Sequence, residues 1–298
     1  MSEVYLNGRF MPSDEARISP MDRGFLFGDG IYEVIPSYQG RLVGFHPHID
    51  RMQSGLAEIG ICCPWSHAQW LAMIEELLAR NGSGDLGIYL HVSRGTDVKR
   101  GHAFPVGVAP TIFAFTFAIN PPPTGLPGSA KPIQVASALD LRWKRCHIKS
   151  TSLLGNVLHH QQGIAAGYQE TLLFNEQDEL TEGSSCNAFI VKHGVISTPA
   201  LDHQILPGIT RLLLLQILRA HSSLQVEERV ISKAEVFDAD EVWLTSSSKE
   251  LMPVIAIDGQ PVGHGDVGAI WYQAQQLFSA HKFDDLAGLS PTAYHQQP

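Results

Sequence analysis

The stretch Arg142-Trp-Lys-Arg-Cys-His-Ile-Lys149-Ser-Thr-Ser-Leu-Leu-Gly155 places a lysine between a basic segment and a run of hydroxyl residues. Apolar residues then recur up to Ala166, which predicts a helix from about Leu153 capped by one of the hydroxyls. Lys149 is therefore expected where a strand gives way to a helix. An amine among other cations loses its proton more easily and attacks carbonyl groups more readily. The alternative is a solvated basic turn, since lysine clusters are usually surface charge.

Composition limits the classes of protein to which the chain can belong. It has 298 residues, 44% of them apolar, which is enough for two globular domains. A formal net charge of −9 argues against nucleic acid or an anionic membrane as a partner. No apolar run suits a membrane span, and no secretory signal pattern is present. The four cysteines have no CxxC spacing, so reduced thiols in a cytoplasmic protein are expected.

The clearest linker in the sequence contains three consecutive prolines, Pro121-Pro-Pro123, which favour a stiff extended segment. Hairpin signals such as Asn7-Gly8 and His193-Gly194 occur among helix-like segments in both halves. This mixture predicts α+β layers rather than a doubly wound parallel sheet. The expected organisation is an N-terminal α/β domain at 1–119, a linker at 120–130, a C-terminal cofactor-binding domain at 131–289 and a disordered tail at 290–298.

Several other segments have residue types that suit a ligand, although each also has an ordinary structural explanation. Glu182-Gly-Ser-Ser-Cys-Asn187 could let a ligand approach the backbone, or be a turn with a capping acid. Leu206-Pro-Gly-Ile-Thr210 could be a phosphate cradle or a plain helix start. Thr245-Ser-Ser-Ser248 is another hydroxyl-rich loop of weak specificity. Arg100-Gly-His102 could hold a carboxylate or be exposed loop charge. His46 and His48 have metal-ligand spacing but no evident partners, so no metal is expected.

Together and in this order, the motifs resemble the fold-type IV pyridoxal-phosphate aminotransferases. This family includes D-amino acid aminotransferases, branched-chain aminotransferases and aminodeoxychorismate lyases. The resemblance extends from about Val4 to the last expected helix and implies a two-domain α+β architecture with pyridoxal 5′-phosphate as cofactor. The motifs that carry it are Asp22-Arg-Gly-Phe-Leu-Phe-Gly-Asp-Gly-Ile-Tyr-Glu33, His48-Ile-Asp-Arg51, Ile148-Lys-Ser150, Thr181-Glu-Gly-Ser-Ser-Cys-Asn187, Leu206-Pro-Gly-Ile-Thr210 and Thr245-Ser-Ser247.

The resemblance also implies residue roles. Lys149 would bond covalently to the cofactor and move a proton between substrate and cofactor, and Glu182 would hydrogen-bond the pyridine nitrogen. Tyr32 and Glu33 would lie on the substrate side of the ring. Cys186 stands where serine or another small residue is expected. The implied cofactor-binding set is Arg51, Lys149, Glu182, Ser185, Asn187, Leu206, Gly208, Ile209, Thr210, Ser246 and Ser247.

Within the family the chain is most similar to the bacterial D-amino acid aminotransferases, because Arg100, His102 and Tyr32 match their trap for the substrate carboxylate. The implied activity is D-amino acid:2-oxo acid exchange through pyridoxamine phosphate, with D-alanine and 2-oxoglutarate as the standard pair. Arg100 and His102 would reach the partner's site in a homodimer. The alternatives are an (R)-amine transaminase, an L-branched-chain aminotransferase, a lyase, or a cofactor carrier without turnover. Ser184-Ser185 disfavours the branched-chain enzymes.

Overall fold

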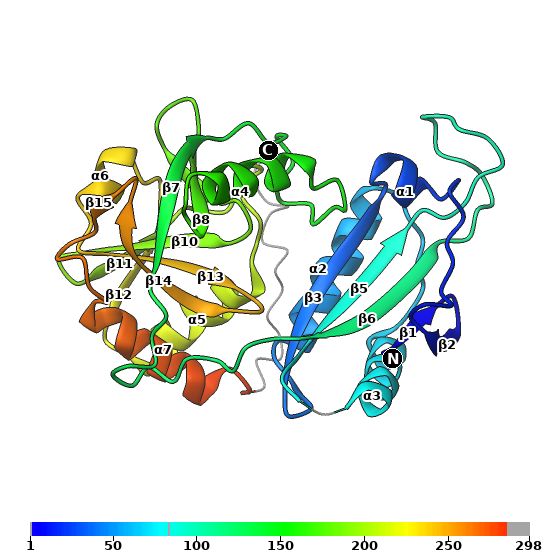
Figure 1. Ribbon diagram of the computed structural model, residues 1–298, viewed down its shortest axis with the longest axis horizontal. Coiled ribbons are helices and arrows are strands. Elements are labelled where there is room, and N and C mark those ends of the chain that lie inside the picture. The colour runs from blue at the N-terminus through cyan, green and yellow to red at the C-terminus, as the bar shows by residue number, and fades with distance from the viewer. Residues whose placement is uncertain (1, 83, 285–298) are drawn as a thin grey trace. The chain divides into compact units, whose positions relative to one another are not determined.

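Residues 2–82 and 84–284 are described by the structure, a computed structural model, and they divide into two units (Figure 1). The first unit contains the described residues up to Pro121 together with Ile148–Leu153. The second contains Pro122–His147 and the described residues from Leu154 onward. The chain changes unit within the proline-rich segment, whereas Ile148–Leu153, expected in the C-terminal domain, packs with the first unit. The expected tail at 290–298 lies outside the described residues.

The first unit is built on a six-stranded sheet with the order β2-β1-β6-β5-β3-β4. The β1–β2 hairpin turns at Asn7 and Gly8, whose φ angles of 47° and 93° are those that a type I′ turn requires. All of the paired strands in this sheet run antiparallel. The strands are β1 (Glu3–Leu6), β2 (Arg9–Pro12), β3 (Gly30–Tyr38), β4 (Arg41–Leu42), β5 (Leu86–Ser93) and β6 (Thr111–Ala118).

Three helices accompany this sheet: α1 (Arg23–Phe27), α2 (Phe45–Glu58) and α3 (His67–Asn81). Helix α3 starts with a capping box in which the side chains of Ser66 and Gln69 each bond the other's backbone amide. Helix α2 lies along the sheet beside β3 (Figure 1). Ile31 and Ile35 of β3 and Ile49 of α2 are completely buried in one core. Burial of these aliphatic residues stabilises the contact between helix and sheet.

The second unit has a nine-stranded mixed sheet in the order β12-β11-β10-β13-β14-β7-β8-β9, with β15 beside β14. Strand β7 pairs in parallel with β8 and β14, while β10, β13 and β14 pair antiparallel. This mixture confirms the α+β class expected from the sequence. The elements are β7 (Ile133–Leu139), α4 (Leu154–Ala165), β8 (Glu170–Phe174), β9 (Leu180–Gly183), β10 (Asn187–Lys192), β11 (Val195–Thr198), α5 (Ile209–His221), β12 (Gln225–Glu228), α6 (Lys233–Phe237), β13 (Glu241–Ser246), β14 (Glu250–Ile257), β15 (Gln260–Pro261) and α7 (Ala269–His281).

The segment around Lys149 differs from the expectation that a strand leads directly into it. Strand β7 ends at Leu139, and the chain reaches Lys149 through turns. Segment 148–151 instead runs antiparallel to the start of β3, where the Tyr32 amide donates to the Lys149 carbonyl at 3.1 Å and the Thr151 amide to the Gly30 carbonyl at 2.9 Å. These backbone bonds fix the lysine against β3.

Within the described residues, no helix combines the length and apolar character that a bilayer crossing requires.

Candidate active site

Lys149 and Tyr32, both selected from the sequence, lie next to one another in the first unit. The Lys149 Nζ atom is 4.2 Å from the centre of the Tyr32 ring. The Tyr32 ring in turn stacks on Tyr89, with ring centres 5.6 Å apart and an interplanar angle of 24°. Because the lysine backbone is also bonded to Tyr32, the amine is held over one aromatic face. An amine in this position is restricted in the directions from which a reactant can approach.

Glu33 points away from Tyr32, since successive residues of a strand face opposite sides. Its carboxylate is completely buried, accepts hydrogen bonds from Arg51 Nε and Nη2 at 2.7 Å each, and lies 2.7 Å from His48 Nδ1. Burial alone would raise the pKa of Glu33, but the charges of Arg51 and His48 lower that pKa to about 2. The sequence offered no carboxylate for His48 and placed Glu33 beside the substrate. In the structure this carboxylate orients Arg51 and His48.

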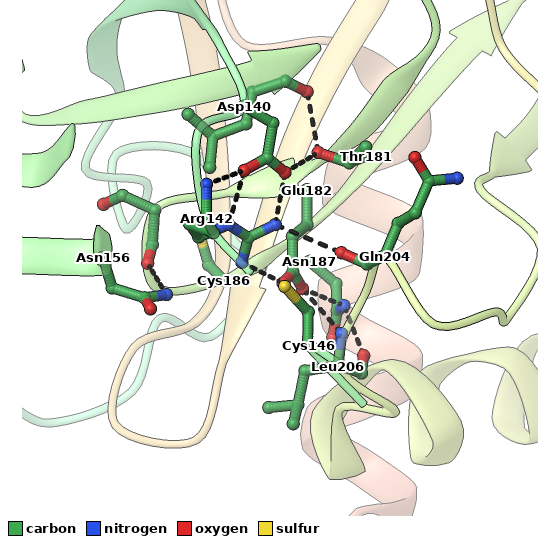
Figure 2. Close-up of polar contacts among 12 residues, drawn as sticks. Asp140, Arg142, Cys146, Asn156, Thr181, Glu182, Cys186, Asn187, Gln204 and Leu206 are labelled. Atoms are coloured by element: carbon green, nitrogen blue, oxygen red, sulfur yellow. Dashed lines mark hydrogen bonds and ion pairs between the residues drawn. The ribbon is translucent and has the colours of Figure 1, made fainter. Parts of the chain in front are cut away.

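Glu182 on β9 is the centre of the polar network in the second unit (Figure 2). Its Oε1 accepts from Arg142 Nη1 at 2.5 Å, and its Oε2 accepts from Asn187 Nδ2 and from the Leu206 amide, each at 3.1 Å. A carboxylate offers about four lone-pair positions. One of the Glu182 lone-pair positions therefore remains to accept a hydrogen bond from a ligand. A protonated ring nitrogen would be such a donor.

Arg142 joins Glu182 to a second acid, Asp140, as Figure 2 shows. Its Nη2 lies 2.7 Å from Asp140 Oδ2, which also accepts from the Thr181 hydroxyl at 2.8 Å. Burial raises the pKa of Glu182, although the charge of Arg142 acts in the opposite direction. Burial would lower the pKa of Arg142, but the charges of Glu182 and Asp140 outweigh burial and raise it. The sequence had grouped Arg142 with the cations around Lys149. In the structure its charge is instead engaged by two carboxylates of the second unit, to which Arg142 itself belongs, whereas Lys149 belongs to the first.

The N-terminus of α5 and the end of β13 provide polar groups for an anion. Gly208 is the N-cap of α5 and gives no side-chain bond to the first turn. Thr245 Oγ1 and Ser246 Oγ are buried without a hydrogen-bond partner among the described residues, and Ser247 follows in the turn after β13. Free amides at a helix start attract negative charge. The predicted phosphate residues Ile209, Thr210 and Ser246 are therefore placed on elements suited to that role.

Asn187 connects this anion cradle to Glu182. It faces Thr245 across the β10–β13 pairing, and its Nδ2 bonds both Glu182 and the Leu206 carbonyl. A Cβ at Gly208 would lie 1.9 Å from Asn187 Oδ1, so any other residue there would displace the Asn187 side chain. The structure thus brings together the predicted residues Glu182, Asn187, Leu206 and Gly208.

Glu170 is a site residue that sequence reasoning missed. This buried carboxylate on β8 accepts from the hydroxyls of Ser184 and Ser185 and from the Thr171 and Ser184 amides. Burial raises the pKa of Glu170, but the hydrogen bonds, led by the one from Ser184, keep it below its usual value. Glu170 thereby fixes the turn that follows Glu182. No local pattern marks this role, because the acid and the turn are separated in sequence and meet only through the β8–β9 pairing.

Arg100 and His102 lie on the loop between β5 and β6 and are exposed. The structure brings both to the same side chain. The Arg100 guanidinium is 5.0 Å from the centre of the Phe27 ring, and the His102 ring is 5.6 Å from it. These two residues lie in the first unit with Tyr32, Glu33, Arg51 and Lys149, whereas the remaining predicted site residues lie in the second unit.

Comparison with known proteins identifies the family. Residues 30–257 match the family described as amino-transferase class IV. A D-alanine aminotransferase of Bacillus licheniformis is 39% identical over 273 residues, covering 92% of this chain and 94% of that protein. The Escherichia coli branched-chain amino acid aminotransferase shares the fold with a TM-score of 0.86 at 22% identity, covering 96% of this chain and 97% of the other.

A third relative was solved with a ligand. It is a branched-chain amino acid aminotransferase from T.th., complexed with N-(5′-phosphopyridoxyl)-L-glutamate, with a TM-score of 0.82, 22% identity and coverage of 95% of this chain and 94% of the other. The family match covers most of the chain, and the fold agrees with it. The chain therefore belongs to the class IV aminotransferases.

Proposed function

We propose that this protein is a pyridoxal-phosphate-dependent D-amino acid:2-oxo acid aminotransferase. The observation that carries the proposal is the 39% identity, over 92% of the chain, to a relative named D-alanine aminotransferase. The position of Arg100 and His102 on one exposed loop supports the choice of substrate, because a guanidinium and an imidazole together can hold a carboxylate. The small-molecule partners are then amino acids and 2-oxo acids, with D-alanine and 2-oxoglutarate as the standard pair.

The residues present fit pyridoxal 5′-phosphate. Thr245 and Ser246 have buried hydroxyls without partners, and the α5 N-terminus offers free amides, so a phosphate group has donors there. Glu182 retains an acceptor position for a ring nitrogen that carries a proton. When bound, this cofactor accepts the electron pair released from the substrate Cα. The proposed binding set remains Arg51, Lys149, Glu182, Ser185, Asn187, Leu206, Gly208, Ile209, Thr210, Ser246 and Ser247.

The chain's own residues would then divide the work of the reaction. Lys149 would hold the cofactor, and its amine would take the proton from the substrate Cα and return it on the cofactor side. The Tyr32 ring beneath the amine restricts its movement. Arg100 and His102 would hold the carboxylate of the substrate in the site that they serve, and so decide which enantiomer presents its α-hydrogen to the lysine of that site. Arg142 keeps Glu182 in place through their 2.5 Å contact.

We further propose a homodimer in which Arg100 and His102 serve the partner's site. Exposed apolar side chains support such a contact. Val98 and Val106, near Arg100, are 95% and 99% exposed, and Leu154, Val157 and Leu158 are exposed on α4. Isolated exposed apolar residues are ordinary, but several on one helix favour an interface. The free thiols of all four cysteines support a reducing compartment, for which we propose the cytoplasm.

The half-reaction with each enantiomer of alanine tests the substrate assignment. Purified protein loaded with pyridoxal phosphate is mixed with D-alanine or L-alanine, and the cofactor absorbance is followed. D-alanine is expected to bleach the absorbance, and L-alanine to leave it unchanged. Bleaching by L-alanine alone contradicts the proposal, and activity on an (R)-amine without a carboxylate points to the amine transaminases instead.

The covalent role of Lys149 is tested separately by borohydride reduction followed by peptide mass analysis. The reduction traps whichever lysine is bonded to the cofactor aldehyde. We expect the label on the peptide that contains Lys149. A label on another lysine, or no label in protein that retains the cofactor, rules out the proposed catalytic residue.

A further inference from the structure

The ring of Phe27, at the end of α1, is shared by both residues of the proposed carboxylate trap. Arg100 and His102 contact this ring from the β5–β6 loop, at 5.0 and 5.6 Å. A guanidinium over an aromatic face is attracted by the negative charge of that face. Among the residues that the structure describes, Arg100 has no carboxylate partner, so Phe27 supplies its side-chain contact and leaves its charge for a ligand.

The backbone of the same loop is held by Arg23, which is also on α1. Arg23 is 3% exposed and donates from Nη1 to the Gly101 carbonyl at 2.5 Å and from Nη2 to the His102 carbonyl at 3.3 Å. Its Nε bonds Asp29 Oδ2 at 2.8 Å. A buried guanidinium with a carboxylate partner is fixed in orientation. The carbonyls of Gly101 and His102 are therefore bound to a rigid group rather than to a mobile surface side chain.

Asp29 completes this arrangement by binding a second arginine at the start of the loop. Arg94 is 7% exposed, donates to Asp29 from Nε and Nη2 at 2.8 and 2.9 Å, and stacks at 3.6 Å on the ring of Phe104. Burial raises the pKa of Asp29, but hydrogen bonds from Arg94 and Arg23 lower it below its usual value, which keeps the acid ionised. Arg94 at the start of the 94–104 loop thus binds Asp29 directly, and Gly101 and His102 near its end are linked to the same carboxylate through Arg23.

We propose that Phe27 and Asp29 are positioning residues that preorganise Arg100 and His102 for the carboxylate of the substrate. The inference rests on the proposed function, since it assigns a purpose to the loop that the trap requires. Exposed arginine side chains lose rotational freedom when they bind a ligand, which weakens binding. A shared aromatic contact and a fixed backbone reduce that loss before the substrate arrives. Phe27 and Asp29 therefore act on substrate affinity and not on the reacting atoms.

Substitution of Phe27 tests this role through the separation of KM from kcat. We expect Phe27→Ala to raise KM for D-alanine about three- to tenfold, while kcat and pyridoxal-phosphate affinity change less than about twofold. Phe27→Tyr keeps the ring face and should restore KM. The matched control is Phe25→Ala, because Phe25 lies on the same helix and is 77% exposed. An unchanged KM in Phe27→Ala, or an equal rise in Phe25→Ala, overturns the inference.

Limited digestion with trypsin gives a readout that does not depend on activity. The loop contains Lys99 and Arg100, after which trypsin can cut, and peptide masses report cleavage at these bonds. Phe27→Ala and Asp29→Asn should be cut there about tenfold faster than the unaltered protein, whereas Phe25→Ala and Phe27→Tyr should not. Equal rates in all of these proteins contradict the proposed anchoring.

Arg100→Ala separates failure of this inference from failure of the proposed function. If Arg100→Ala raises KM for D-alanine and Phe27→Ala does not, the trap stands and the positioning role of Phe27 is wrong. If Arg100→Ala leaves KM unchanged, the carboxylate-binding role is itself wrong, and the inference falls with it. A rise in both variants, with faster cleavage in Phe27→Ala, supports both.

Discussion

At the scale of single residues, the Arg142–Glu182 ion pair should be required for stability. The two side chains are only 3% and 5% exposed. Arg142→Ala would leave Glu182 buried without its cation, and we expect a loss of about 3 kcal/mol in the free energy of unfolding. Urea denaturation at pH 7 measures this loss. Arg145→Ala, three residues away and exposed, is the control and should change stability by less than about 0.5 kcal/mol.

The same comparison defines the failure of this prediction. If Arg142→Ala and Arg145→Ala are equally stable, the prediction is wrong. Water or Asn187 would then replace the contact that Arg142 makes with Glu182. The spectrum and affinity of bound pyridoxal phosphate should also change in Arg142→Ala only, because Glu182 then loses the contact that holds its Oε1 atom.

A motif can select a candidate residue from the sequence, but it does not reveal a partner that is distant in sequence. Lys149 and Glu182 were selected from their motifs, and their roles stay predictions. The partner of Arg142 was not predictable, because Glu182 follows it 40 residues later and the two meet only through folding. The contacts of Glu33 with Arg51 and His48 were not predictable for the same reason, and its expected place on the substrate side stays a prediction.

At the scale of elements, the start of α5 and the start of β10 must fit closely. Gly208→Ala would place a Cβ where Asn187 Oδ1 lies, at 1.9 Å. Asn187 must then move and release Glu182, so we expect a loss of about 1–3 kcal/mol in stability and weaker binding of pyridoxal phosphate. Urea denaturation and titration with the cofactor measure the two effects. The control is Gly84→Ala, where nothing lies within 4 Å of the added Cβ; equal results in both variants contradict the prediction.

Elements with a clear period or turn signal were predictable from the sequence. The helix expected from about Leu153 is α4, the possible helix start at 206–210 is that of α5, and the hairpins at Asn7-Gly8 and His193-Gly194 are where the sequence indicated. Helix α1 was missed because five residues rich in glycine and aromatics show no helical period. It forms through the Asp22 cap, whose carboxylate also accepts from the hydroxyls of Ser93 and Thr111. Such contacts arise only after the sheet has formed.

At the scale of the whole molecule, ionised acids are buried in both units. The pKa values of Asp29 and Glu33 in the first unit, and of Asp140 and Glu170 in the second, are all below their usual values. In each case burial acts to raise the pKa, and hydrogen bonds and nearby cations outweigh it. A carboxyl group with a depressed folded-state pKa stabilises the fold above its unfolded pKa. That stabilisation is lost as the pH falls towards the folded-state value. Both units should therefore lose stability in acid.

Glu33 should account for a measurable part of this acid sensitivity. Its ordinary pKa of 4.5 falls to about 2 in the folded protein, so its contribution is complete above pH 4.5 and declines below it. Glu33→Gln removes the titration, although it lowers stability at pH 7 by leaving Arg51 without its acid. The stability difference between the unaltered protein and Glu33→Gln should therefore shrink by about 2 kcal/mol between pH 6 and pH 3. Urea denaturation across this range measures it, with the exposed Glu75→Gln as the control for loss of a charge. A difference that stays constant with pH would show that Glu33 titrates alike in the folded and unfolded chain, and that Arg51 and His48 do not hold it ionised.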